Sequence, residues 1–260
     1  MSDGLSPSPA SLTLRTLSRK RERAALPLAL LLALLTACAA PRGPHDLGAG
    51  PEGNLDVLGP TPDLVAAGLP GNWVGLGRVG SGQARVVELD GVPALRLIPG
   101  GEGFLVARRI EAPLFMTPYL SWSWNIEHHG AGLHPVRLVV GFHSGGKDAV
   151  EDSSFPSPAG ATLPFHDRSF AIAWADSALR RGSVVKPEAS SPRAPLYIAR
   201  GGRENAGSWW LETVDLHRIY RDLWPGDDPM RIRVVFIGLA ATPQTGPAPV
   251  AHVSGVRLSR

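Results

Sequence analysis

The chain has 260 residues, with 26 Lys or Arg and 23 Asp or Glu, for a formal net charge of +3. The excess of basic residues lies at the N-terminus, because residues 1–37 hold five basic and two acidic side chains. The remaining residues hold 21 of each. A neutral remainder offers no basic surface for a polyanion, so nucleic acid is excluded as an expected partner. The roughly 220 residues beyond residue 37 are enough for one domain with a hydrophobic core.

The N-terminal segment has the features of an export signal. A polar stretch ending in basic residues precedes an apolar run over residues 24–35. That run is too short to cross a bilayer, which takes about 20 residues as a helix, and it has the length of a signal-peptide core. It ends in Leu35-Thr36-Ala37-Cys38, which resembles the lipobox of bacterial lipoproteins. We therefore expect residues 1–37 to be a cleavable lipoprotein signal peptide and Cys38 to be lipidated.

Cys38 is the single cysteine of the chain, so no internal disulfide can form. Several acyl chains on one residue would give a stable anchor, since one chain binds a membrane only weakly. The residue that follows is Ala39 and not the aspartate of an inner-membrane retention signal. The expected location is therefore the outer membrane, with the membrane itself as a partner through acylated Cys38. Residues 38–55 show no hydrophobic periodicity and are interpreted as a flexible tether.

Residues 56–260 are expected to form a single β domain. The 30 Gly and 25 Pro residues favour a loop-rich β protein over a helical one. Asp90-Gly91 is a strong signal for a tight hairpin turn. Residues 119–126 alternate strictly between apolar and polar side chains, as in a half-buried strand. Ten such runs are separated by turn signals, at 83–89, 92–98, 103–110, 119–126, 135–142, 169–175, 196–200, 209–214, 230–240 and 250–258.

One short helix is expected after residue 215. Asp215 can cap it, and apolar residues recur with helical spacing from Leu216 to Leu223 before Pro225-Gly226 ends it. Many strands and one short helix predict an all-β fold, a jelly-roll-like β-sandwich of about ten strands. Two long irregular segments, 144–168 and 182–195, are either functional loops or insertions without a role.

Several motifs follow one another along the domain. They are Gly68-Leu69-Pro70-Gly71-Asn72-Trp73, Gly91-Val92-Pro93-Ala94-Leu95-Arg96, Pro118-Tyr119-Leu120-Ser121-Trp122-Ser123-Trp124, Val136-Arg137-Leu138-Val139-Val140-Gly141-Phe142, Ile172-Ala173-Trp174-Ala175, and Trp210, Glu212, Asp215, Leu216 and Tyr220. Their order resembles the DUF3047 family of uncharacterised bacterial exported proteins, over roughly residues 68–258. The chain departs from the family pattern at Val214, at Ile219 and in the non-acidic stretch 240–246. A shared fold does not fix a function, so the resemblance implies the domain and no activity.

The sequence offers little that could carry catalysis. It has no Gly-x-Ser-x-Gly elbow and no glycine-rich loop that opens a helix, so no cofactor is expected. Histidines at 128, 129, 134 and 143, near Asp148, could be metal ligands, but we interpret them as loop histidines and expect no metal. Glu212 and Asp215 could act as paired carboxylates in glycoside hydrolysis, although Asp215 is better explained as the helix cap.

The aromatic residues are a better signal of function. Trp122, Trp124 and Trp174 lie in apolar patterns typical of a core, whereas Trp209 and Trp210 must point to opposite sides of one strand. Indole rings beside Arg or Glu can stack on sugar rings and orient hydroxyl groups.

Arg137 falls on the strand face opposite the apolar side chains of residues 136, 138, 140 and 142 and could anchor an anionic group or a hydroxyl. We therefore expect a non-enzymatic, lipid-anchored β-sandwich that binds carbohydrate or another envelope component through the polar face of a sheet, with Arg137, Trp210 and Glu212 as contacts. The alternatives are an envelope polysaccharide hydrolase that uses Glu212 as acid or base, and an assembly lipoprotein with a protein partner.

Overall fold

The computed structural model describes residues 47–48, 50, 52–59, 69, 71–80, 82–147, 162–188 and 193–260. All the described residues fall in one compact unit that spans residues 45–260. The expected signal peptide and Cys38 lie outside the described residues, as do Asp148 and parts of segments 144–168 and 182–195.

The domain consists of two β-sheets. The larger has eight strands in the order β1-β6-β13-β8-β9-β11-β10, with β3 paired to β6. Its strands are β1 Leu47–Gly48, β3 Trp73–Gly77, β6 Phe104–Pro113, β8 Val136–His143, β9 Arg168–Ala175, β10 Val184–Val185, β11 Leu196–Gly201 and β13 Arg233–Ala241. The smaller sheet has six strands in the order β12-β7-β14-β5-β4, with β2 paired to β14. Its strands are β2 Leu55–Asp56, β4 Ala84–Leu89, β5 Val92–Leu97, β7 Tyr119–Ile126, β12 Trp209–Asp215 and β14 Ala251–Ser259.

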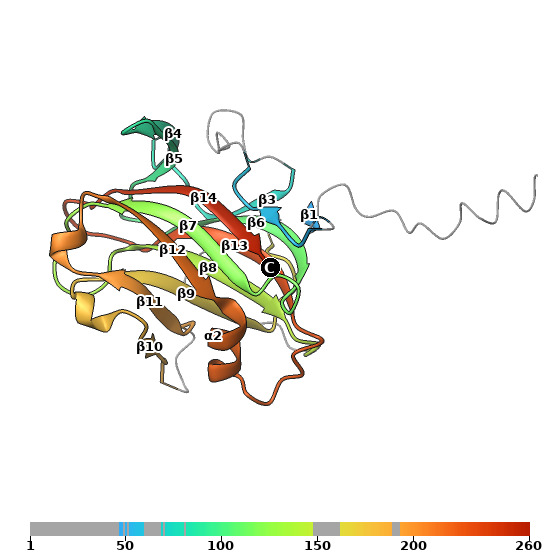
Figure 1. Ribbon diagram of the computed structural model, residues 1–260. Helices are drawn as coiled ribbons and strands as arrows, with labels where there is room; N and C mark the ends of the chain where they lie inside the picture. Colours follow the sequence, from blue (N-terminus) through green and yellow to red (C-terminus); the bar gives the residue numbers. More distant parts are fainter. Residues whose placement is uncertain are drawn as a thin grey trace, which may run out of the picture. The chain divides into compact units, whose positions relative to one another are not determined.

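The two sheets form a sandwich in which the chain crosses repeatedly from one sheet to the other. The path from β6 to β7, β8, β12, β13 and β14 changes sheet again and again, as in a jelly roll. Figure 1 shows β7, β12 and β14 lying over strands of the larger sheet. The prediction of an all-β, jelly-roll-like sandwich is confirmed.

All ten predicted strands are present, with ends shifted by a few residues. Strand β13 begins at Arg233 and not at residue 230, because the backbone turns there and the Arg231 N–H donates to the Asp228 carbonyl at 3.0 Å. The prediction did not include β3 or the two-residue strands β1, β2 and β10. Leu47–Gly48 and Leu55 belong to the segment interpreted as a tether, yet they pair with β6 and β14 respectively.

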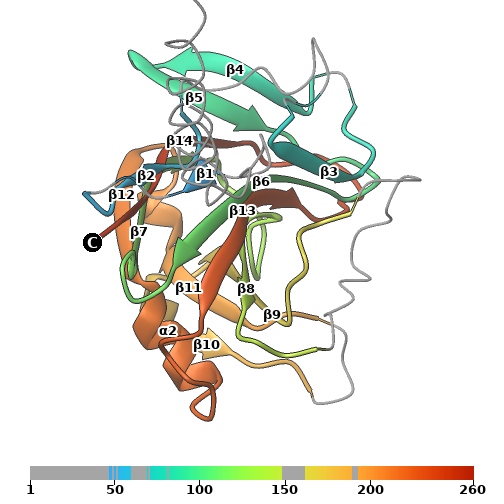
Figure 2. The ribbon, with the colours of Figure 1, turned by 90° about the vertical axis from the view of Figure 1, so that its right-hand side faces the viewer.

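Local sequence signals set the tightest turn and the helix. Asp90 and Gly91 both have positive φ, 54° and 76°, as the hairpin turn between β4 and β5 requires. Figure 2 shows this hairpin at the end of the smaller sheet. Two short 3₁₀ turns, Ala178–Arg180 and Arg203–Asn205, flank β10 and β11. The α-helix α2, Leu216–Leu223, is capped by Asp215, whose Oδ1 accepts from the Arg218 N–H at 2.9 Å.

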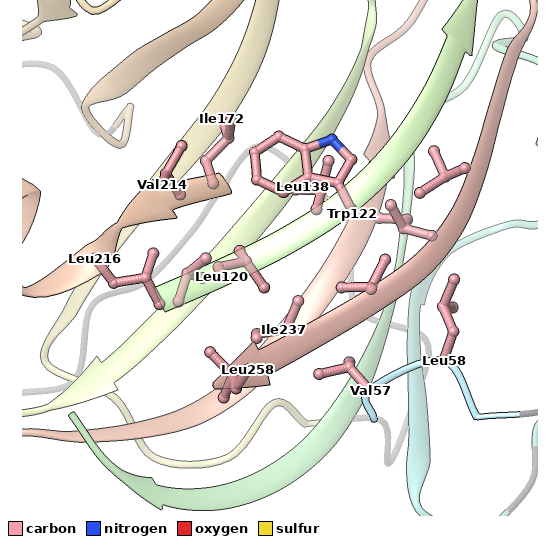
Figure 3. Packing of buried hydrophobic residues seen from close by; sticks show 14 of the residues in the cluster. Val57, Leu58, Leu120, Trp122, Leu138, Ile172, Val214, Leu216, Ile237 and Leu258 are labelled. Atoms are coloured by element: carbon pink, nitrogen blue, oxygen red, sulfur yellow. The ribbon is translucent and has the colours of Figure 1, made fainter. Parts of the chain in front are cut away.

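The core lies between the sheets and is formed by the side chains of each strand that point inward. Trp122, Trp124 and Trp174 are almost fully buried there, and the rings of Trp124 and Trp174 meet edge to face at 5.4 Å. Figure 3 shows Trp122 from β7 and Leu138 from β8 within this cluster. The expectation that these three tryptophans form the core is confirmed. None of the described helices is long and apolar enough to span a membrane.

Candidate functional site

The structure brings two of the three predicted ligand contacts together and separates the third from them. Trp210 and Glu212 alternate with the exposed Leu211 on β12 and point into the sandwich. Arg137 lies on the outer face of the larger sheet, because its strand partner Ala240 and its neighbour Val139 belong to a second apolar cluster outside the main core. The prediction that all three share one polar sheet face is wrong. Alternation assigns residues to two faces but does not say which face is inside.

Glu212 is 2% exposed and forms ion pairs with two arginines, Arg200 and Arg181. Arg200 on β11 donates from Nε to Glu212 Oε1, and Arg181 donates from Nη2 to Oε2 at 3.2 Å. Arg181 also donates from Nε to the Ala199 carbonyl at 3.1 Å. Both carboxylate oxygens are therefore engaged in joining β12 to β11, and little of Glu212 is presented to solvent. A ligand-binding or catalytic role for Glu212 stays a prediction.

Trp210 belongs to the same cluster. The Arg200 guanidinium lies over its ring, 3.9 Å from the ring centroid, as a cation–π contact. Its Nε1 donates to the Asn205 carbonyl at 2.8 Å, and its ring packs against the main core. These contacts give Trp210 a role in closing the sandwich edge where β11 and β12 meet. The sequence did not reveal Arg200 and Arg181, since no local pattern links them to Glu212.

Of the neighbouring Trp209 and Trp210, Trp209 points out of the sandwich, as the alternation along a strand predicts for one of the two. Trp209 is paired with Asn125 on β7. Asn125 is in turn paired with His252 on β14, and His252 is paired with Arg96 on β5. Each of these residues lies beside core residues of its own strand, so all four side chains share the outer face of the smaller sheet. We call these four residues the Trp209 row. Arg85 on β4 is paired with Arg96 and extends the row at its exposed end.

Two polar side-chain atoms of the Trp209 row have no hydrogen-bond partner within the described residues. These are the buried atoms Trp209 Nε1 and His252 Nδ1. Trp209 as a whole is half-buried, and Asn125 is only 5% exposed. Burial lowers the pKa of His252, and the positive charge of Arg96 lowers it further, against Glu127 and a backbone hydrogen bond at Asn125. The imidazole is therefore neutral at neutral pH and carries one donor and one acceptor. An indole, a neutral imidazole and a guanidinium together suit a ligand rich in hydroxyl groups.

Arg137 lines a cavity of about 490 Å³ on the opposite side of the sandwich. Its Nε is buried and has no hydrogen-bond partner within the described residues. Burial lowers the pKa of Arg137, and the nearby charge of Arg193 adds to this effect. The sequence suggested a polar face here. The structure shows a largely apolar one, because Val139, Ala171 and Ala240 surround the arginine.

The predicted histidines are divided between two places in the structure. His134 is fully buried, its Nδ1 accepts from the Val136 N–H at 3.1 Å, and its ring meets His129 edge to face at 5.2 Å. Burial, with a smaller contribution from His129, lowers the pKa of His134 to about 3. His143 lies at the far end of β8, with Nδ1 3.8 Å from Asp167 Oδ1. Among the residues that the structure describes, no group of three or more His, Cys, Asp or Glu could hold a metal ion.

Asp167 belongs to a polar network at that end of β8. Its carboxylate accepts from the Ser144 N–H and hydroxyl at 2.8 and 2.6 Å and from the Gly146 N–H at 2.8 Å. These hydrogen bonds outweigh burial and lower the pKa of Asp167. The serine donates to the aspartate and not to a histidine, so this cluster fixes a loop and does not activate a nucleophile.

Comparison with known proteins finds similarity in three-dimensional structure alone. No family model matches the chain, and no curated protein matches it. The family 12 endoglucanase 3 of Trichoderma harzianum is 11% identical, covers 68% of this chain and 82% of its own, and has a TM-score of 0.39. A mannan-recognising module, TmCBM27, is 15% identical, with 80% and 95% coverage and a TM-score of 0.31. A family 30 carbohydrate-binding module is 14% identical, with 74% and 93% coverage and a TM-score of 0.32.

Proposed function

We propose that this chain is a non-catalytic carbohydrate-binding module whose ligand rests on the Trp209 row. The observation that carries the proposal is the register that places Trp209, Asn125, His252 and Arg96 side by side on one outer sheet face. A partly exposed indole face can stack on the apolar face of a sugar ring. His252 and Arg96 are half-buried and provide donors and an acceptor for hydroxyl groups, whereas Asn125 is 5% exposed and contributes little accessible polar surface.

The length of the row across the sheet suits a polymer better than a small molecule. The row continues to Arg85, so its polar groups extend over five strands of the smaller sheet. Beside it on the same face lie Ser123 and Ser254, which are paired with each other and are half-buried. A chain of sugar residues could therefore lie across the strands and contact several positions in turn.

We further propose that the module is tethered to the bacterial outer membrane through acylated Cys38, after removal of residues 1–37. The lipobox-like end of the apolar run supports this proposal. An anchored sandwich with a glycan-binding face would hold an envelope polymer close to the membrane. Membership of the DUF3047 family is part of the same proposal and rests on the motif order described above.

The test is binding to an array of envelope polysaccharides and oligosaccharides, followed by tryptophan fluorescence titration of each hit. We expect a saturable hit with the unaltered chain, and a loss of affinity of about tenfold or more in Trp209→Ala, in line with the energy of a stacking contact. Leu211→Ala is the matched control, because Leu211 is 71% exposed on the same face of the same strand. If the Trp209→Ala protein, shown to be folded, binds as tightly as the unaltered chain, the Trp209 row is not the site.

A further inference from the structure

The cavity beside Arg137 lies on the opposite outer face from the Trp209 row and is unexplained by carbohydrate binding. Its floor comes from four adjacent strands, since Ala240 is paired with Arg137, Ala171 with Val139, and Leu196 with Ala171. Its volume of about 490 Å³ is within the range of small-molecule sites. The floor is therefore a fixed surface of the sheet, not a gap between mobile loops.

The walls of this cavity are mainly apolar. Besides the floor residues, they are formed by Leu133, Ala194, Thr242 and Pro243. The Thr242 hydroxyl donates to the Pro135 carbonyl at 3.3 Å, which occupies its proton. A sugar would lose the hydrogen bonds of its hydroxyl groups to water here and regain few of them. The cavity therefore favours a ligand with an apolar body.

Arg137 brings a positive charge to the floor of the cavity. Among the described residues that line it, none has an acidic side chain. A guanidinium stays protonated even where burial disfavours its charge, so Arg137 brings a positive charge into an apolar site. Its Nε is buried and has no partner in the part of the chain that the structure describes. Such a group is stabilised when a ligand brings an anionic acceptor to it.

We propose that this cavity binds a small carboxylate with an apolar body. The planar carboxylate matches the fork of guanidinium donors and would receive hydrogen bonds from Arg137, including one from Nε. The apolar body would lie along Val139, Ala171 and Leu196 and exclude water from the ion pair. The site is independent of the Trp209 row, so either proposal can fail without the other.

The test uses the purified full chain and three probes in isothermal titration calorimetry. Octanoate has both the charge and the apolar body, 1-octanol has the apolar body alone, and glucuronate has a carboxylate on a polar ring. We expect saturable binding of octanoate, with 1-octanol and glucuronate at least tenfold weaker, since a charged hydrogen bond and the burial of an alkyl chain each contribute that much. Equal binding of octanol would show an apolar cavity without a role for charge, and equal binding of glucuronate would show a site for any carboxylate. Either result would overturn the proposal, as would the absence of octanoate binding.

Two variants and one control test whether octanoate binds in the cavity. Arg137→Met keeps an apolar stem of similar length and should weaken octanoate binding by roughly tenfold to a hundredfold. Ala171→Leu fills the floor and should abolish binding while leaving Arg137 in place. Arg257→Met is the control, because Arg257 is exposed on the smaller sheet. If octanoate binds Arg137→Met and Arg257→Met alike, with both folded by near-ultraviolet circular dichroism, the cavity is not the site. Trp209→Ala should leave octanoate binding unchanged.

Discussion

Arg200 and Glu212 form an ion pair that joins the two sheets of the sandwich at their edge. Arg200 lies on β11 of the larger sheet and Glu212 on β12 of the smaller, and the side chains are 12% and 2% exposed. The same guanidinium also stacks on Trp210. One arginine thus contacts an acid and an aromatic ring that are two residues apart on the facing strand. The cluster therefore stabilises the sandwich where the edge strand of the smaller sheet meets β11.

Replacing Glu212 by Gln should destabilise the domain strongly. The change removes the negative charge between Arg200 and Arg181 and leaves a buried guanidinium without its counterion, at a cost of about 3 kcal/mol. Urea unfolding followed by fluorescence would measure the free energy of unfolding. The matched control is Glu111→Gln, which breaks the solvent-exposed pair with Arg233 and should cost less than about 1 kcal/mol. Similar losses in the two variants would argue against a buried, structural pair at Glu212.

Trp210→Ala and Trp209→Ala should separate stability from binding. Trp210 packs on the core, stacks under Arg200 and donates to the Asn205 carbonyl, so its removal should cost about 3 kcal/mol of unfolding free energy. Trp209 lies outside the core cluster, so its removal should cost less stability and more glycan affinity. Thermal unfolding and the array titration, run on both variants, measure the two effects. A larger stability loss in Trp209→Ala would reverse the assignment of the two side chains to the inside and the outside.

Sequence patterns predicted much of the fold because its signals are local. Alternation in residues 119–126, the Asp90-Gly91 turn and the Asp215 cap all depend on neighbours within a few residues, and all three are present in the structure. The short strands β1, β2 and β10 were missed because two residues carry no periodicity. Strand β3 contains two glycines, which weaken any strand signal.

The candidate sites could be predicted only in part, since they depend on long-range pairing. Alternation placed Asn125 on the face opposite Trp124, but nothing local shows that His252 lies beside it, 127 positions later. The buried position of Glu212 depends on arginines from a different sheet, and a lone glutamate in a sequence normally suggests an exposed surface. The cavity at Arg137 likewise arises from four strands that are distant in the sequence.

The proposed anchor predicts a specific loss of membrane attachment. In a bacterial host, Cys38→Ser should abolish incorporation of labelled palmitate and move the protein from the membrane to the soluble fraction of the periplasm. The reason is that no other cysteine is available in the chain to carry an acyl group. Ser81→Cys serves as a control that adds a thiol elsewhere, and it should not restore labelling when combined with Cys38→Ser. Membrane attachment and labelling that survive in Cys38→Ser would contradict the lipoprotein proposal.

His134 predicts a loss of stability in mild acid. Its folded pKa of about 3 lies below the ordinary value of 6.5, so the unfolded chain binds more protons between those two values. The stabilising effect of a neutral His134 is complete above pH 6.5 and declines as the pH falls below that value. Between pH 8 and pH 5 the free energy of unfolding should fall by about 2 kcal/mol from this group alone. Denaturant unfolding at a series of pH values measures the slope.

His134→Asn isolates this contribution. The Asn side-chain oxygen can replace Nδ1 as acceptor for the Val136 N–H, while the amide does not titrate. Burial also lowers the pKa values of His129 and His252, but both residues are present in the two proteins, so their effects largely cancel in the comparison. The Asp167 carboxylate has a lowered pKa and contributes only in stronger acid, so the measurement stops at pH 5. We expect His134→Asn to be less stable than the unaltered chain at pH 8 and to lose much less stability by pH 5. Parallel pH profiles for the two proteins would show that His134 is not a buried neutral histidine in the folded domain.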